Sequence, residues 1–540
     1  MNLQNHLLVS VLILMLNVFQ MAASSRVFVY PYGHCLNSHL LTMEKVVHVL
    51  VSGGHHVTML VPDTYNGPYV QNANFTTVDL VKYAAPTHVE PMCGFKSLKT
   101  FMKSSTADLW HQFQKSTLAY CEAILQSGPI VKSLKETKFD LAIYEHVDYC
   151  SRILADYIDI PFISLVSQGM ESIYPRTPTY MPTILCCSTD HMSMFERFKN
   201  SIIYVFQQAF VALTLRKYEA LKLKFNINTT SSLYVTPDKA SIKFVLGHHV
   251  VDYPGPLLPS TVLLSNMNQL VPSTPLPRTI QQFLDQSPEG VIYMSFGSMI
   301  HGWDPEWEAF FIKTFAKLPY RILWKHGGFL NQTLDSPDIK LIGWAPQEEI
   351  LKHPNVKVFV THSGLNSVLE VARAGKVVVA IPLFADQFYQ AKKLVHRVKI
   401  GVAVDIHTLT PSELAKAILQ TAQNDIFRAN AQYAAQLMAG SPLRDNQAIL
   451  YWSEFVIRNG GAPHLQSRVQ SMPWYEVMLV DVLATGLSIM VTVATSLIIL
   501  YRWFYPKHEP SNGNYDVKHI RSTYINDNDI ELSALKLRKL

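Results

Sequence analysis

The chain has 540 residues, 46 lysines and arginines against 41 aspartates and glutamates, and 48% hydrophobic residues. This length exceeds one ordinary hydrophobic core, so we expect two large domains with further segments attached. The small positive balance is not gathered into a basic stripe with interleaved aromatic residues, which argues against a nucleic-acid-binding protein. Membrane segments account better for the high apolar fraction.

The N-terminal segment has the pattern of a secretory signal. Leu7 to Phe19 is a largely apolar run, and the small residues Ala22 and Ala23 follow it. We expect a signal peptide over residues 1–23. Because Met1 to His6 contains no lysine or arginine, a signal anchor is the rival interpretation, although the run is short for a membrane span.

Residues 24–255 are expected to form an α/β domain. Val27 to Tyr30 reads as a strand, Ser38 to Ser52 as a helix with apolar residues at helical spacing, and His56 to Val61 as the next strand. The segment Lys138 to Leu165 again reads as strand, loop, helix and strand. This alternation is typical of a doubly wound parallel sheet.

Two stretches of this domain are rich in aromatic residues and methionine. They are residues 62–138 and Tyr174 to Leu233, and the second includes the apolar run Phe195 to Leu215. They are candidate walls of a pocket for a lipophilic molecule. Ordinary core packing is one alternative, and contact with a membrane surface is another, because basic residues lie near the apolar run.

Residues 256–440 are expected to form a second α/β domain. The β-branched run Val356 to Thr361 reads as a strand that stops at His362, and the helix-forming run Leu365 to Ala374 follows. A helix N-terminus offers free N–H groups and the positive end of a dipole, so we expect it to bind an anion. The next strand, Val377 to Pro382, leads into polar side chains that suit sugar hydroxyls.

The C-terminal part has the pattern of a membrane anchor. We assign 441–480 to a helix, read over Asn446 to Arg458, and a membrane-proximal segment, 481–501 to a transmembrane helix, and 502–540 to a tail. Val482 to Leu500 is uncharged, has the length of a membrane span and carries aromatic flanks. The basic residues that follow predict a single-pass protein whose tail is cytosolic and whose domains are lumenal.

Several smaller signals fit a lumenal protein. Three N-x-T sequons stand at Asn74, Asn228 and Asn331. The end of the tail, Lys536 to Leu540, resembles a dibasic retrieval signal for the endoplasmic reticulum, although any basic tail end could look like it. The first half contains all six cysteines, which permit disulfides of unknown pairing and match no metal-site spacing: Cys35, Cys93, Cys121, Cys150, Cys186 and Cys187.

The segment from Trp344 to Gln387 carries the strongest pattern. Tryptophan, glutamine, histidine, glycine, glutamate and an Asp-Gln pair follow one another there in a fixed order. The segment resembles the signature of the UDP-glycosyltransferases, the family that includes the membrane-bound UDP-glucuronosyltransferases of animals. The resemblance implies a GT-B fold, with two Rossmann-like domains facing a cleft, the acceptor bound by the N-terminal domain and the UDP-sugar by the C-terminal domain.

The resemblance also implies roles in donor binding. Trp344 would stack on uracil, Gln347 would bond the nucleoside and Glu370 would accept hydrogen bonds from the ribose. Asp386 and Gln387 would bond the sugar that is transferred.

The diphosphate would be held by a second group of residues. His362 and the amides of Gly364, Asn366 and Ser367 would bind it, and Ser298 would add a further phosphate contact. The arrangement needs no metal, and we expect no cofactor other than the UDP-sugar co-substrate.

A catalytic base is expected at His39. The acceptor hydroxyl needs a base that titrates near neutrality, and a helix N-terminus disfavours the protonated imidazole. In the family, the pattern that stands here at Ser38 to Met43 carries this base. The animal enzymes orient it with an aspartate at the end of a strand, and this chain has Glu145 at the matching position, with Asp148 as the other candidate.

We therefore expect an inverting transfer of a hexose or glucuronic acid to a hydroxyl of a small lipophilic acceptor, in the membrane of the endoplasmic reticulum. Two alternatives stay open: a membrane lipid as acceptor, or a catalytically silent membrane protein that binds UDP-sugars. The sequence does not resolve glucose from glucuronate, the identity of the acceptor, or association between copies of the chain.

Overall fold

The structure is a computed structural model. It describes residues 24–32, 37–67, 70, 75–89, 98–103, 106–169, 180–186, 189–227, 233, 239–271, 275–298, 300, 302–326, 336–344, 346–440, 444–470 and 472–505. The expected signal peptide, the three sequons, Cys35, Cys93, Cys187 and the dibasic tail end lie outside these residues. The chain divides into two compact units, Met1–Met472 and Pro473–Leu540.

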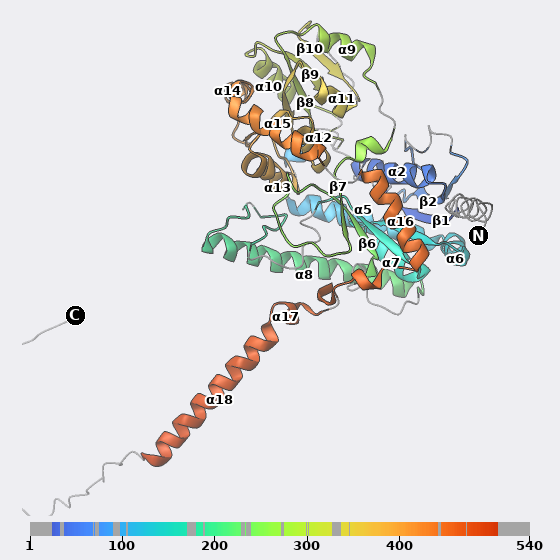
Figure 1. Cartoon of the computed structure of the whole chain (residues 1–540), viewed down its shortest axis with the longest axis vertical. Coiled ribbons are helices and arrows are strands. Elements are labelled where there is room, and N and C mark those ends of the chain that lie inside the picture. Colours follow the sequence, from blue (N-terminus) through green and yellow to red (C-terminus); the bar gives the residue numbers. More distant parts are fainter. Residues whose placement is uncertain are drawn as a thin grey trace, which may run out of the picture. The chain divides into compact units, whose positions relative to one another are not determined.

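A parallel sheet organises the N-terminal half of the first unit (Figure 1). Among the described residues, its seven strands lie in the order β3-β2-β1-β4-β5-β6-β7. The chain moves outward from β1 to β3 and then returns beside β1, so the strand order reverses between β1 and β4. The strands are β1 (Arg26–Tyr30), β2 (His56–Pro62), β3 (Val78–Tyr83), β4 (Leu141–Glu145), β5 (Phe162–Val166), β6 (Ile242–Leu246) and β7 (Thr261–Leu264).

A second parallel sheet follows in the same unit. Its six described strands lie in the order β10-β9-β8-β11-β12-β13, which repeats the plan of the first sheet and reverses between β8 and β11. This order is that of Rossmann-like domains. The strands are β8 (Val291–Ser295), β9 (Arg321–Lys325), β10 (Ile339–Ile342), β11 (Val356–Thr361), β12 (Val377–Ala380) and β13 (Gly401–Ala403).

Helices cover the two sheets. Those of the N-terminal half are α2 (Asn37–Ser52), α4 (Leu98–Lys103), α5 (Thr106–Gln126), α6 (Gly128–Glu136), α7 (Cys150–Ile158) and α8 (Met194–Lys224). Those that follow are η3 (Met267–Leu270), α9 (Arg278–Asp285), α10 (Pro305–Phe315), α11 (Gln347–Lys352), α12 (Leu365–Arg373), α13 (Gln387–Lys392), η4 (Lys393–Val398), α14 (Pro411–Gln423), α15 (Asp425–Ala439), α16 (Asp445–Asn459), η5 (Pro463–Leu465) and η6 (Arg468–Gln470).

Burial on both faces explains the continuous apolar strands. Successive residues of a strand point to opposite faces, so Val27 and Val29 join the cluster formed with α2, while Phe28 and Tyr30 join the cluster formed with α5, α6, α7 and α8. The disulfide Cys121–Cys150 ties α5 to the first residue of α7. Helix α16 packs against α2.

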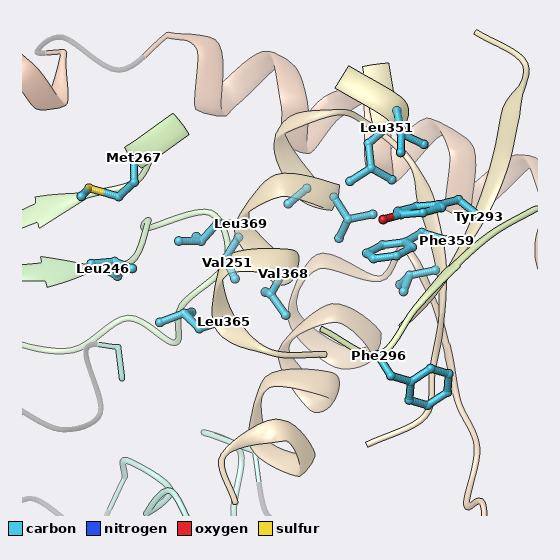
Figure 2. Packing of buried hydrophobic residues seen from close by; sticks show 14 of the residues in the cluster. Leu246, Val251, Met267, Tyr293, Phe296, Leu351, Phe359, Leu365, Val368 and Leu369 are labelled. Carbon is cyan, nitrogen blue, oxygen red and sulfur yellow. The ribbon is translucent and has the colours of Figure 1, made fainter. Parts of the chain in front are cut away.

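The two sheets share one buried apolar cluster. Figure 2 shows Leu365 and Leu369 of α12 near Val251, which follows β6, with Leu246 and Met267 farther along the same cluster. Apolar packing between α12 and the segment after β6 therefore holds the two halves of the first unit together. The same helix begins at the predicted anion site.

The second unit contains α17 (Trp474–Val477) and α18 (Val480–Phe504). An 18-residue window of α18 has a mean hydropathy of 2.2, and none of it is buried. The helix is long and apolar enough to cross a bilayer. It includes the predicted transmembrane segment, residues 481–501.

Candidate active site

His39 and Glu145 lie where the strand order of the first sheet reverses. His39 is in the first turn of α2, which follows β1, and Glu145 is the last residue of β4. Ligands of doubly wound sheets bind beyond the carboxyl ends of the strands at such a reversal. His39 Nδ1 and Glu145 Oε1 are 3.4 Å apart, with 14% of the histidine side chain and none of the glutamate side chain exposed. This is an ion-pair distance, slightly longer than a normal hydrogen bond.

The second oxygen of Glu145 is held by Ser167. The hydroxyl of Ser167, which directly follows β5, donates to Glu145 Oε2 over 2.9 Å. This bond leaves Oε1 directed at the imidazole. Ser167 is not among the residues predicted from the sequence, because its only local signal is its place directly after a buried strand.

Asp148, the other carboxylate considered for this role, is engaged elsewhere. It accepts hydrogen bonds of 2.8 Å from the Tyr30 hydroxyl and from the backbone N–H of Cys150. Burial, with a smaller contribution from the charge of Glu145, raises the pKa of Asp148 to about 6. Of the two carboxylates, Glu145 is the one within ion-pair distance of His39.

Aromatic rings extend from His39 toward the second sheet. The ring centroids of His39 and Tyr32 are 6.2 Å apart, those of Tyr32 and Phe113 are 6.1 Å apart, and those of Phe113 and Trp110 are 5.7 Å apart. Trp110 in turn lies 6.1 Å from Phe384, in the loop before α13. We call Tyr32, Phe113 and Trp110 the aromatic series. These rings form an apolar wall beside the imidazole of His39.

The reversal in the second sheet, between β8 and β11, brings Gly297 and His362 together. A Cβ atom added to Gly297 would lie 2.6 Å from His362 Nε2, and the φ of +70° is one that side-chain-bearing residues rarely adopt. Next to them, Gly364 is the N-cap of α12 and makes no side-chain cap. The N–H groups of the first turn, which includes Asn366 and Ser367, therefore suit an anionic ligand.

The charge state of this anion site follows from burial. Burial, followed by the positive charge of Lys325, lowers the pKa of His362 to about 4, so the imidazole is neutral at physiological pH. Lys325, the last residue of β9, donates to the carbonyl of Gly297 over 3.1 Å. Burial lowers the pKa of Lys325 as well. Ser298 is half-buried in the same loop as Gly297. Lys325 is not among the site residues predicted from the sequence.

A hydrogen-bonded group joins three of the predicted nucleoside and phosphate residues. Gln347 Nε2 donates to Ser367 Oγ over 2.9 Å and to Glu370 Oε2 over 2.6 Å, while Gln347 Oε1 accepts from the Tyr293 hydroxyl over 3.3 Å. Trp344 lies three residues before Gln347 and is 60% exposed. The indole therefore offers a flat apolar face to solvent.

The predicted sugar-binding loop lies at the end of the aromatic series, because Phe384 of this loop contacts Trp110. Burial raises the pKa of Asp386, and the charge of His39 is the largest of the influences that lower it. Gln387 Oε1 accepts from two backbone N–H groups of its own loop, over 2.9 and 3.1 Å. Ser363 and Ala385 have left-handed φ values of +66° and +52°. Such backbone strain is common in ligand-binding loops.

The structure thus places the predicted residues in two groups. His39 and Glu145 belong to the first sheet, and the donor-binding candidates belong to the second. Contacts between aromatic rings lead from His39 to Phe384 in the loop that contains Asp386. Within the described part of the chain, no group of three or more His, Cys, Asp or Glu side chains is arranged to hold a metal ion. That the reaction needs no metal stays a prediction.

The two Rossmann-like sheets define the class of GT-B glycosyltransferases. The structure is similar to Arabidopsis thaliana UGT89C1 complexed with quercetin, with a TM-score of 0.55, 18% identity and coverage of 81% of this chain and 100% of that one. It is also similar to CalG4, the calicheamicin glycosyltransferase, with a TM-score of 0.55, 18% identity and coverage of 81% and 99%. At such identities the likeness shows the fold.

The family model for UDP-glucoronosyl and UDP-glucosyl transferases matches residues 26–511, and the chain belongs to this family. Relatives include UDP-glucuronosyltransferase 1A5 of Rattus norvegicus, 28% identical over 91% of this chain and 93% of the relative. Another is UDP-glucuronosyltransferase 2B17 of Homo sapiens, 27% identical over 88% and 92%. The predicted family and GT-B fold are confirmed, and the chain is a UDP-sugar glycosyltransferase.

Proposed function

We propose that the chain transfers a hexose or glucuronic acid from its UDP-sugar, with inversion, to a hydroxyl of a small lipophilic acceptor. The observation that carries this proposal is the His39–Glu145 pair, 3.4 Å apart at the reversal of the first sheet. The aromatic series leads from His39 to Trp110, which lies 6.1 Å from Phe384 in the loop that contains Asp386. Ring contacts therefore connect the base to the predicted sugar-binding loop, as a transfer between the two domains requires.

The pair performs the proton transfer. Because Nδ1 of His39 faces Glu145, Nε2 takes the proton of the acceptor hydroxyl. The acceptor oxygen forms its bond to the anomeric carbon from the face opposite UDP, the bond to the diphosphate breaks, and UDP leaves with the electron pair. Glu145 stabilises the imidazolium that forms, and general-base catalysis of this kind contributes about 10² to 10⁴ in rate.

The donor lies on the second sheet in this proposal. Its uracil stacks on the exposed Trp344, and its ribose is bound through Glu370. The diphosphate meets the first-turn amides of α12, the neutral His362 and Lys325, and these fixed donors stabilise the charge that develops on the leaving group. The sugar lies against Asp386 and Gln387.

The domain roles and the location are part of the proposal. Residues 24–255 bind the acceptor, residues 256–440 bind the UDP-sugar, and both lie in the lumen of the endoplasmic reticulum behind a cleaved signal peptide. Residues 441–480 lead to a single-pass anchor in α18, residues 481–501, and the tail 502–540 is cytosolic. The length and apolar character of α18 support the anchor.

Turnover of the full chain in microsomes tests the proposal. We expect sugar transfer from UDP-glucose or UDP-glucuronate to a phenolic acceptor, and a β-glycoside from the α-linked donor. The His39→Ala variant should lower kcat by about 10² to 10⁴. His56→Ala is the matched control, because His56 begins β2 and pairs with the exposed Asp79 at 3.8 Å. Equal rates for His39→Ala and the wild type would overturn the mechanism, as would an α-linked product.

A further inference from the structure

Helix α8 carries large apolar side chains that are exposed on the surface of the unit. From Phe195 to Leu213, seven of them are 40% to 72% exposed. They recur at intervals of three or four residues, so they share one side of the helix. We call this surface the α8 apolar face; it consists of Phe195, Phe198, Ile202, Val205, Phe206, Phe210 and Leu213.

The other side of α8 explains why the helix holds its place. Tyr218 and Leu221 are buried in the cluster beneath the first sheet, and the Tyr218 hydroxyl donates to Thr117 of α5 over 2.9 Å. Asn200, which is fully buried, donates to the carbonyl of Met181 over 2.8 Å. These contacts fix the helix near both ends. Its apolar side chains therefore stay exposed on the surface of the folded unit. Figure 1 shows α8 as a long helix along the edge of the unit.

The charge of α8 favours a lipid surface as the partner of this face. The helix has six lysines and arginines against two glutamates. Arg197 and Lys199 are exposed beside the apolar face, and Arg216 and Lys217 are exposed just beyond it. A long helix with exposed aromatic residues on one side and basic residues at its borders is typical of helices that lie in the interface of a bilayer. Contiguous exposed apolar patches mark interaction surfaces.

A candidate membrane anchor follows the first unit after a short connection. The first unit ends at Met472, and α18, which is long enough to span a bilayer, begins at Val480. Seven connecting residues span at most about 25 Å when fully extended. A short tether keeps the first unit at a high local concentration near the bilayer that holds its anchor. The unit therefore meets this bilayer far more often than it meets a second copy of the chain.

We propose that the α8 apolar face is seated in the interfacial zone of the bilayer that holds α18, and that lipophilic acceptors enter the site from this bilayer. The second part rests on the proposed function. It follows from Phe210, whose ring lies 5.9 Å from Trp110. Trp110 belongs to the aromatic series that ends at Tyr32, 6.2 Å from the catalytic candidate His39. Aromatic contacts therefore run from the membrane-facing helix to the base.

Photochemical cross-linking of the full chain in nanodiscs of phosphatidylcholine and phosphatidylinositol tests the docking. Position 206 carries p-benzoylphenylalanine, and position 433 carries it in the matched control, since Phe206 is 71% and Tyr433 62% exposed. We expect about tenfold more lipid adduct at position 206 than at 433, measured by mass spectrometry. Equal yields overturn the docking, and so does a cross-link from position 206 to a second copy of the chain. This measurement needs no turnover, so its failure is separate from failure of the proposed function.

Kinetics of the variant Phe198→Ser/Phe206→Ser in the same nanodiscs test whether lipophilic acceptors enter the site from the bilayer. With an acceptor that partitions into the bilayer, KM should rise about three- to tenfold while kcat is unchanged. With a water-soluble acceptor, both should equal the wild-type values, which also shows that the variant is folded. An unchanged KM for the partitioning acceptor would overturn the proposal that acceptors enter the site from the bilayer. The cross-linking experiment would then decide by itself whether the α8 apolar face lies in the bilayer.

Discussion

The orientation of the proposed base depends on residues that do not themselves meet substrate. Ser167 holds one oxygen of Glu145 and leaves the other 3.4 Å from His39. A glutamate has one more rotatable bond than an aspartate, so its carboxylate needs a fixed partner to stay in place. Ser167 supplies that partner and acts as a positioning residue.

Removal of this hydroxyl should disturb catalysis without disturbing donor binding. For Ser167→Ala we expect kcat to fall about three- to tenfold, with KM for the UDP-sugar unchanged, because the carboxylate loses one hydrogen bond. The acid limb of the kcat/KM profile should move to lower pH, since the misplaced Glu145 stabilises the imidazolium less. Ser167→Thr keeps the hydroxyl and should restore both quantities. A Ser167→Ala enzyme with the wild-type pH profile would rule out the positioning role.

The buried His362 should make the folded state sensitive to acid. Its folded pKa of about 4 lies below the unfolded value of about 6.5, so the unfolded chain binds this proton first. The free energy of unfolding therefore falls as the pH drops from about 6.5 to about 4. The raised pKa of Asp148, about 6, changes the free energy of unfolding in the opposite direction as the pH drops, because the folded state holds that proton more tightly than the unfolded chain does. The test must therefore compare variants.

We expect the wild type to lose about 2 kcal/mol more unfolding free energy than His362→Gln between pH 7 and pH 5. Denaturant unfolding at the two pH values measures this difference. The prediction fails when both proteins lose the same amount.

At the scale of elements, the loop after β8 decides whether the anion site can form. Gly297 has a φ of +70°, and its Cα faces the His362 ring. For Gly297→Ala we expect a loss of about 1–2 kcal/mol in stability from the left-handed backbone. The displaced imidazole should also raise KM for the UDP-sugar about tenfold or more.

Gly128→Ala is the matched control for this loop. A Cβ atom at Gly128, the first residue of α6, meets nothing within 4 Å. This variant should keep the wild-type KM and stability. Melting curves and donor titrations of the two variants give both quantities, and a Gly297→Ala enzyme with normal KM would show that the loop does not shape the donor site.

For the whole molecule, a buried ion pair joins the two halves of the first unit. Lys393 Nζ of η4 lies 2.5 Å from Asp252 Oδ1, in the segment after β6, with 0% and 1% of the two side chains exposed. Asp252 also accepts from the backbone N–H of His248 over 2.7 Å. The pair therefore fixes the second sheet to the segment that leaves the first.

Loss of one partner should be costly, because it leaves a buried charge uncompensated. Lys393→Met should destabilise the full chain by about 3–5 kcal/mol, measured by thermal unfolding in detergent. The double variant Lys393→Met/Asp252→Leu should recover much of this loss, since neither charge then remains. If the double variant is as unstable as the single one, packing and not charge explains the effect.

The sequence by itself determined several of the elements and the donor motif. Helix α16 was expected over Asn446 to Arg458 and spans Asp445–Asn459, while the strand expected over Val377 to Pro382 ends at Ala380. Such local features follow from periodicity and from burial on both faces of a sheet. The donor-binding candidates from Trp344 to Gln387 lie within one segment, so their order alone showed the pattern.

Only the tertiary structure decided which distant residues meet. It placed Glu145 and not Asp148 beside His39, supplied Ser167 from the loop after β5 and Lys325 from β9, and paired Cys121 with Cys150. It also showed that one side of α8 is exposed. The physical reason is that these contacts depend on the order of strands in the sheet and on what covers each helix. Hydrophobic periodicity tells which face of an element is apolar, but not which neighbour, or which solvent, that face will meet.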